Sequence, residues 1–283
     1  MDAASTSDSS DPIVWNAAGQ LLVDPELRYS LIVLNQPIRD PPLFRELWRS
    51  ATTKIAADGG ANHIYELSKQ TPPGPEGVEP AQSEQFKDLD AIIGDLDSLA
   101  DEARRYFSRS RVIRDDDQYS TDFAKAVRLA RREAPGRDVV CMGGLGGRVD
   151  QGLSQLHHLY LFQKSPTYAD GRMYLVSGDS LSFLLKGGGR PHHIRVRERE
   201  PRHLVPSHRL AGEPFGKHVG IIPVGEPAVI STRGLEWDVR DWPTAFGGQM
   251  STSNHVLPET EVVEVRTDKD VLFTIALRKV PST

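Results

Sequence analysis

The stretch AIIGDLDSLADEARRYF (residues 91–107) decides how this chain folds. It opens with an apolar run that stops at Gly94, continues with Asp95 and Asp97, and ends in a segment with helical spacing. An apolar run of this length, ended by a glycine, is typical of a buried strand. Two carboxylates in one tight turn repel each other. A helix N-terminus, a basic side chain or a metal ion must therefore offset them.

On both sides of this stretch, strand-like and helical segments alternate. We expect strands within residues 29–38, 53–58, 89–95, 111–117 and 137–147, and helices within 42–51, 63–69, 98–107, 120–134 and 149–163. Ser98 is predicted to cap the third helix, and Ser120 or Thr121 to begin the fourth. Alternation at intervals of about 30 residues predicts βαβ units and a parallel sheet, with ligands outside the carboxyl ends of its strands.

The pattern changes near residue 185. Short strand-like pieces at 219–224, 228–239, 262–268 and 271–278 follow, separated by glycine and proline. They predict an antiparallel all-β domain, a small sandwich or barrel. We therefore expect a disordered tail at 1–25, an α/β domain with a parallel sheet at 26–185, and an all-β sandwich domain at 186–283. A basic, His/Arg-rich stretch at 186–218 is expected to be a solvated loop insertion within the second domain.

Composition excludes several classes of protein. The 283 residues carry a formal net charge of −5, which is a poor starting point for a dedicated nucleic-acid binder. No stretch approaches the ~20 apolar residues of a membrane span. The N-terminus lacks the basic and apolar regions of a secretory signal. The single cysteine, Cys141, allows no internal disulfide and suits a reducing compartment. We expect a cytoplasmic protein without nucleic-acid or membrane partners.

Acidic residues lie at the ends of three of the predicted strands: Asp58, the pair Asp95 and Asp97, and the cluster at 115–117. Asp58 precedes Gly59, Gly60 and a helix that contains Asn62, an arrangement that can present backbone N–H groups to phosphate. The alternative is an ordinary strand-to-helix turn. The D-x-D pair Asp95 and Asp97 can hold Mg²⁺ through carboxylate oxygens. Its alternative is a solvated acidic turn.

Two further segments supply phosphate-binding groups. Asp122 lies in the first turn of a predicted helix, where the helix macrodipole alone would also favour it, and Gln118 can donate to a phosphate. The glycine-rich segment at 143–147 ends at Arg148, a fork-shaped donor suited to phosphate, before Asp150 and Gln151. It is neither a Walker A loop nor a dinucleotide fingerprint. Together these strand ends predict a Mg²⁺–polyphosphate site for phosphoryl-type transfer.

The second domain offers a different kind of site. Trp237, with Ser251, Ser253 and Asn254, could grip a flat heterocycle, and a cationic ring would add a cation–π term of ~1–2 kcal/mol. The alternative is a core tryptophan, because the residues around it alternate as a strand does.

Eight strings occur in the order found in one family: LNQP, ADGGAN, GDLDS, STDF, GGLGGRVDQ, IPVG, GLEW and STSN. The chain thus resembles a thiamine pyrophosphokinase (thiamine diphosphokinase) of the eukaryotic type, over roughly residues 30–277. Each string alone is weak, but the ordered set is specific. The resemblance implies transfer of the diphosphate group of ATP to the hydroxyl of thiamine, giving thiamine diphosphate and AMP. It also implies an α/β nucleotide-binding catalytic domain, a thiamine-binding β-sandwich, Mg²⁺, and a homodimer with active sites between subunits.

The resemblance assigns roles to residues of this chain. The metal positions it implies are Asp58, Asp95, Asp97 and Asp122; the catalytic ones are Asp95, Asp97, Asp122 and Arg148. The ligand-binding positions are Asp58, Gly59, Gly60, Asn62, Gln118, Thr121, Gly146, Gly147, Asp150, Gln151, Trp237, Ser251, Thr252, Ser253 and Asn254.

Two other readings remain open at this point. A haloacid-dehalogenase-like phosphatase also uses D-x-D at a strand end, but it needs a downstream lysine and acidic pair that are not evident here. A non-catalytic nucleotide or thiamine sensor would bind both ligands and form no AMP. The complete set of aspartates argues against a sensor.

Overall fold

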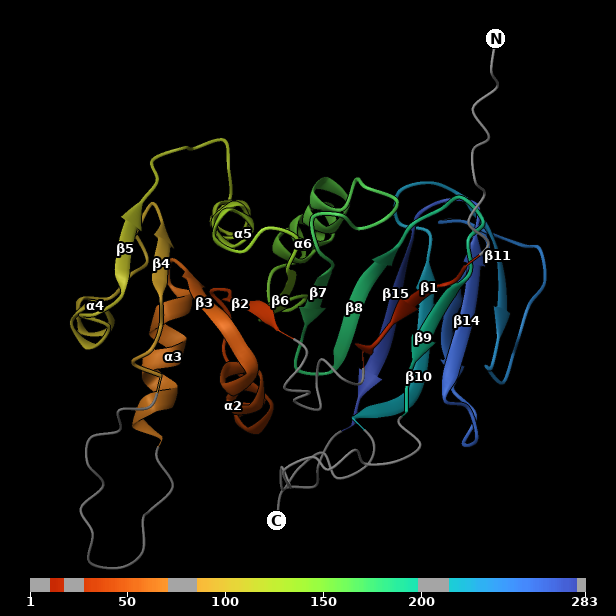
Figure 1. The fold of residues 1–283 in the computed structure, drawn as a ribbon, viewed down its shortest axis with the longest axis horizontal. Helices are drawn as coiled ribbons and strands as arrows, with labels where there is room; N and C mark the ends of the chain where they lie inside the picture. Colours follow the sequence, from red (N-terminus) through yellow and green to blue (C-terminus); the bar gives the residue numbers. More distant parts are fainter. Residues whose placement is uncertain (1–10, 18–27, 71–85, 198–213, 279–283) are drawn as a thin grey trace, which may run out of the picture.

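The computed structural model describes residues 11–17, 28–70, 86–197 and 214–278, and its fold is drawn in Figure 1. A ten-stranded sheet runs through most of the molecule, in the order β13-β10-β15-β8-β7-β6-β2-β3-β4-β5. Six neighbouring strands are parallel: β5 (Arg111–Arg114), β4 (Ala91–Gly94), β3 (Ala51–Ala57), β2 (Tyr29–Val33), β6 (Asp138–Met142) and β7 (Met173–Val176). The remaining four are antiparallel: β8 (Ser180–Leu185), β15 (Val271–Leu277), β10 (Phe215–Ile222) and β13 (Ser251–His255).

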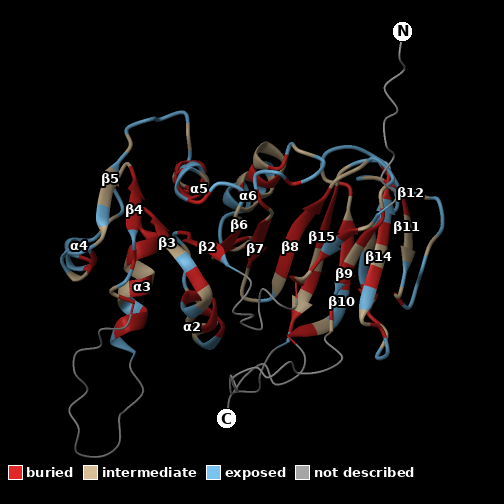
Figure 2. Ribbon diagram, viewed as in Figure 1, coloured by how far each residue is buried: buried red, intermediate tan, exposed pale blue. Residues whose placement is uncertain are grey.

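Helices cover both faces of the parallel half. α2 (Pro41–Ser50), α3 (Gly60–Lys69) and α4 (Asp101–Tyr106) lie on one side, and α5 (Asp122–Glu133) and α6 (Val149–Phe162) on the other (Figure 1). Strand β2 shows why: Leu31 and Val33 join the core cluster under α2 and α3, whereas Ile32, and Leu34 directly after the strand, join the cluster under α5 and α6. Side chains alternate along a strand, so a strand covered on both faces must be apolar throughout. Figure 2 shows the central strands almost entirely buried.

A second, five-stranded sheet packs against the antiparallel half. Its order is β1 (Ile13–Trp15), β9 (His192–Arg195), β14 (Val262–Thr267), β11 (Ala228–Arg233) and β12 (Trp242–Thr244). Trp15 joins the two sheets. It is fully buried, stacks on Phe183 of β8 with 4.3 Å between ring centroids, and donates from Nε1 to Nδ1 of His192 at 3.0 Å. The two sheets form a sandwich.

The structure corrects three of the boundaries expected from the sequence. Ile13–Trp15 form a strand, so a disordered tail over 1–25 is wrong for these residues, because burial of Trp15 fixes them. His192–Arg195 and the start of β10 are strands rather than parts of a loop insertion at 186–218, because His192 and Ile194 point into the core. Residues 198–213 of that stretch lie outside the described residues.

Hydrogen bonding also continues across residue 185, where we expected one domain to end. Strand β8 pairs with β7 on one side and with β15 on the other, so a single sheet joins the α/β part to the sandwich. The pairing of β7 with β8 is antiparallel and the strands are consecutive in the chain. Within the described residues, no helix is both long enough and apolar enough to span a bilayer.

Candidate active site

Three aspartates from different elements meet at the carboxyl ends of the parallel strands. Asp58 follows β3, Asp95 follows β4 and Asp122 is the first residue of α5. Each offers a carboxylate oxygen, and these three oxygens lie within 4.8 Å of one another. We call them the triad. Carboxylate oxygens at this spacing are the donor set that Mg²⁺ and similar hard cations prefer.

Asp58 is the most constrained member of the triad. It is 3% exposed and has a left-handed backbone with φ 43°, a conformation that costs about 1 kcal/mol in a residue other than glycine. Its Oδ2 accepts a hydrogen bond from the Ser98 amide at 3.2 Å, but its Oδ1 is buried without a partner. Burial raises the pKa of this carboxyl above its ordinary value, the hydrogen bond from Ser98 opposes that rise, and the charge of Asp122 adds to it. A buried carboxylate with one unpartnered oxygen, and with two other carboxylates within 4.8 Å, fits a bound cation.

Asp122 is oriented by the start of α5. Thr121, one of the two residues that the sequence suggested for this position, is the N-cap, and its Oγ1 accepts from the amide of Ala124 at 3.1 Å. The same Oγ1 lies 2.9 Å from Nε2 of His158, a buried residue of α6, so the cap is joined to the next helix. Burial raises the pKa of Asp122, and hydrogen bonding to Lys125 opposes that rise.

Gly94 leaves the space in which two triad members meet. A Cβ placed on this residue would lie 2.8 Å from Cβ of Asp58 and 3.0 Å from Oδ1 of Asp122. Carbon atoms in contact normally stay about 3.5–4.0 Å apart. The glycine that ends β4 is therefore needed for the triad to close.

The loop after β4 is held by Asn62 of α3. The Asn62 amide donates to the carbonyl of Ser98 at 2.7 Å and accepts from the amide of Ala100 at 3.0 Å. Both ends of this side chain therefore hold the loop instead of facing a ligand. Leu96 adopts φ 67°, so the chain reverses sharply between the two aspartates.

Asp97 is not one of the three carboxylates that meet. It is exposed, and its Oδ1 accepts from the hydroxyl of Ser98 at 3.0 Å. The prediction that Ser98 caps the following helix is wrong. Helix α4 begins at Asp101, and its N-cap is Ala100. The structure thus brings together three of the four aspartates that the sequence suggested as metal ligands.

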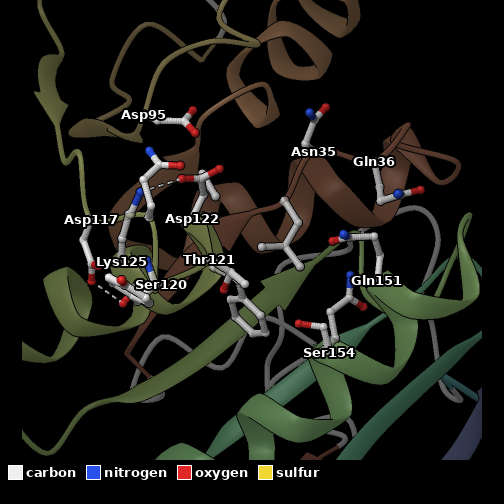
Figure 3. Close-up of a pocket in the computed structure, with 16 residues that line it drawn as sticks. Asn35, Gln36, Asp95, Asp117, Ser120, Thr121, Asp122, Lys125, Gln151 and Ser154 are labelled. Carbon is white, nitrogen blue, oxygen red and sulfur yellow. Dashed lines mark hydrogen bonds and ion pairs between the residues drawn. The ribbon is translucent and has the colours of Figure 1, made fainter.

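A cleft of about 380 Å³ opens beside the triad. Figure 3 shows Asp95, Asp122 and Lys125 on one side of it, and Gln36, Gln151 and Ser154 on the other. It lies over β2, which has β3 on one side and β6 on the other. The direction of the strand order reverses there, and α/β sheets bind their ligands at such a switch point. Gln118, Thr121 and Gln151, three residues suggested by the sequence, line the cleft.

The glycine segment after β6 is fixed from two sides. Gly143 and Gly147 have φ of 92° and 73°, and a Cβ on either would lie within 3.1 Å of the Gln36 side chain. Oε1 of the buried Gln155 accepts from the amide of Leu145. Positive φ and the closeness of Gln36 both require glycine here.

The remaining residues suggested in the α/β part lie around this cleft and do not line it. Arg148 and Asp150 are exposed and pair with each other at 2.6 Å, and Gly146 lies in the same segment. Gly59 and Gly60 are buried at the start of α3 against Asn35 and Val33, so they serve close packing.

The residues suggested in the second part form a separate group. Trp237 is 56% exposed, so it is not a core tryptophan. Its backbone is held by the buried Asn254, whose Oδ1 accepts from the Trp237 amide at 3.2 Å and whose Nδ2 donates to its carbonyl at 2.9 Å. Ser251, Thr252 and Ser253 precede Asn254 on the edge strand β13.

One chain keeps these two groups far apart. Strand β13, which carries Asn254, and strand β4, which leads to Asp95, are separated by eight inter-strand spacings in the ten-stranded sheet. At about 4.8 Å per spacing, the two groups lie roughly 35–40 Å apart. A single copy therefore does not place Trp237 beside its own triad.

Sequence reasoning missed several residues at the cleft. Asn35 and Gln36 line it, and their position directly after the first strand is a signal that could have identified them. Lys125 also lines it but was masked by its place in a regular helical pattern. For Gly94 the sequence pattern predicts only the end of a strand.

The parallel α/β half, the triad and the adjoining cleft define an enzyme of the phosphoryl-transferring, kinase type. The family model of the thiamin pyrophosphokinase catalytic domain matches residues 44–169, and that of the thiamin pyrophosphokinase vitamin B1 binding domain matches residues 192–272. The chain belongs to the thiamine pyrophosphokinase family.

Relatives and solved structures agree with this assignment. The chain is 34% identical over 259 residues to thiamine pyrophosphokinase 3 of Oryza sativa subsp. japonica, covering 88% of this chain and 87% of that protein. It is 27% identical over 297 residues to thiamine pyrophosphokinase of Saccharomyces cerevisiae, covering 88% and 85%. The crystal structure of yeast thiamin pyrophosphokinase shares the fold, with a TM-score of 0.74, 24% identity, and 96% and 93% of the two chains covered.

Proposed function

We propose that this chain transfers the diphosphate group of ATP to the hydroxyl of thiamine at the cleft beside Asp58, Asp95 and Asp122. The observation that carries the proposal is the triad itself: three carboxylates within 4.8 Å, one of them with an orphaned buried oxygen, at the switch point of a parallel sheet. Such a site suits a hard cation and the polyphosphate that accompanies it.

Asp58, Asp95 and Asp122 would hold Mg²⁺. The bound ion supplies positive charge that neutralises the polyphosphate. The hydroxyl oxygen of thiamine forms a bond to the β-phosphorus, and the bond from that phosphorus to the oxygen of AMP breaks, so AMP leaves with the electron pair. A carboxylate accepts the hydroxyl proton, either Asp122 at the cleft or Asp97 on the loop after β4. Gln118, Thr121 and Gln151 line the phosphate path, and Arg148 approaches from the glycine segment with Gly146, Gly147 and Asp150.

Trp237 and the segment from Ser251 to Asn254 bind thiamine. An exposed indole gives the cationic thiazolium a face on which to stack, and Asn254 fixes the position of the indole. Because one chain holds this group roughly 35–40 Å from its own triad, the active enzyme is a homodimer whose sites combine the cleft of one copy with Trp237 of the other. The unpaired, buried Cys141 fits a cytoplasmic location.

The direct test incubates purified protein with ATP, Mg²⁺ and thiamine and measures AMP and thiamine diphosphate by chromatography. Equal amounts of both products are expected. Release of inorganic phosphate independent of thiamine would instead identify a phosphatase, and binding of both ligands without AMP would identify a sensor.

A mixing experiment tests the shared site. With thiamine well below its KM, D95N and W237A each lose activity through a different half of the site, so a hybrid dimer regains one intact site. Activity of the mixture above that of either variant is expected, together with a dimeric mass in solution. No gain on mixing after subunit exchange would contradict the shared site.

A further inference from the structure

Lys125 is a buried cation beside the triad to which the reaction as described so far assigns no role. Its side chain is only 2% exposed, yet it lines the cleft (Figure 3). Nζ donates to the carbonyl of Asp115 at 2.8 Å and to Oδ1 of Asp122 at 3.3 Å. Burying an ammonium group is costly unless opposite charge and hydrogen bonds compensate it.

The charges around this lysine explain why it is buried. Three carboxylates within 4.8 Å repel one another, and Asp122 is the member that Lys125 reaches. We propose that Lys125 is the counter-cation of the triad: it holds the carboxylates together in the metal-free protein, and it is released from Asp122 toward the polyphosphate when the metal binds. The inference rests on the proposed function in one respect only: that function identifies the anion in the cleft as the polyphosphate of ATP.

The geometry indicates which contact is retained. Asp115 is tied to the sheet, because its amide donates to the carbonyl of Gly94 at 2.9 Å, so the carbonyl that accepts from Lys125 is fixed. The contact to Asp122 is longer by about half an ångström and is the weaker hydrogen bond. An ammonium group has three donors, so Lys125 can keep Asp115 and still present two N–H groups to an anion in the cleft.

The test compares K125M, which keeps the length of the side chain and removes its charge, with the wild type. Lys125 and the metal compete for Asp122, so Mn²⁺ titrated into the nucleotide-free protein should bind K125M about 10-fold more tightly or better. The value of kcat/KM for ATP should fall about 10-fold or more, because the polyphosphate loses a donor. The metal-free variant should unfold at lower urea concentration, and saturating Mn²⁺ should restore most of that loss.

A matched control is K54M. Lys54 is also largely buried and pairs with Asp88 at 2.7 Å, but it does not line the cleft. Its replacement should leave Mn²⁺ affinity and kcat/KM unchanged. If K125M does not fold, K125Q takes its place.

Two results would overturn the inference: Mn²⁺ affinity unchanged or weaker in the Lys125 variant, or an unchanged kcat/KM for ATP. A purely structural lysine would not produce opposite changes in the two quantities. Failure of the proposed function is distinguishable, since the wild type would then form no thiamine diphosphate while the effect of K125M on Mn²⁺ affinity would persist.

Discussion

Replacing Gly94 with alanine tests the geometry of the active site most directly. The added methyl group would lie 2.8 Å from Cβ of Asp58 and 3.0 Å from Oδ1 of Asp122. The backbone of Gly94 does not have a positive φ, so alanine introduces crowding without backbone strain. The shorter contact is with Asp58, so Asp58 and the new methyl group must separate by about 0.7–1 Å to reach normal carbon–carbon distance, and the carboxylate of Asp122 must also give way.

Both consequences of this displacement can be estimated. Overpacking by one methyl group costs about 1–3 kcal/mol in the free energy of unfolding. A misplacement of about 1 Å at a reacting centre costs about 10²-fold in rate. We therefore expect G94A to fold, to bind Mn²⁺ more weakly, and to lose about two orders of magnitude in kcat/KM.

The assays are AMP formation, Mn²⁺ titration and urea denaturation, with G152A as the matched control. A Cβ on Gly152 would meet no atom within 4 Å, and this residue lies inside helix α6, where alanine is favoured by about 1 kcal/mol. G152A should therefore be fully active and slightly more stable. Wild-type activity and Mn²⁺ affinity in G94A would refute the close approach of Asp58 and Asp122 across this residue.

Three further predictions follow from the site and the core. D95N should lose Mn²⁺ binding and at least ~10²-fold in turnover. D97N should lose a similar factor in turnover but should bind Mn²⁺ normally. If both variants lost Mn²⁺ binding equally, Asp97 would also be a metal ligand. W237A should raise KM for thiamine about 10-fold and leave KM for ATP unchanged, as measured by initial rates; an unchanged KM for thiamine would remove Trp237 from the site. Burial lowers the pKa of His192 from 6.5 to about 4. Between these two pH values the unfolded chain binds a proton at His192 that the native state does not bind. The stability that is present above pH 6.5 is therefore lost as the pH falls toward 4. The free energy of unfolding, measured with urea, should therefore be about 2 kcal/mol lower at pH 5 than at pH 7 because of His192. The H192Q variant should lose this part of the pH dependence.

Much of the architecture follows from local patterns in the sequence. The apolar runs of β2, β4 and β6 are long enough to be buried on both faces, and proline or glycine ends each run, so the parallel half and the place of its ligands could be predicted. The start of α5 could be predicted to within one residue, Ser120 or Thr121, because a hydroxyl at a helix start can satisfy an amide three residues away, as that of Thr121 does. These features depend on neighbours in the chain.

The features that sequence reasoning missed depend on distant partners. The left-handed backbone of Leu96 and the side chain of Asn62 from another helix decide that Asp95, and not Asp97, belongs to the triad. Neither feature leaves a local pattern in the sequence. Lys125 reads as an ordinary residue of a helix, because its role comes from Asp115 beyond the preceding loop. The three-residue strand β1 is too short for periodicity to detect, and its order comes from pairing with β9 and from burial of Trp15 against β8.

The pairing of β1 with β9 has a consequence for biosynthesis. Trp15 and His192, which bond directly, are 177 positions apart in the chain. A ribosome adding about 5–20 residues per second must therefore keep the nascent N-terminal segment waiting for roughly 10–35 seconds before its partner strand exists. During that interval the indole of Trp15 stays outside any finished core and is open to holding chaperones, so completion of the sandwich is a late, post-elongation event of folding.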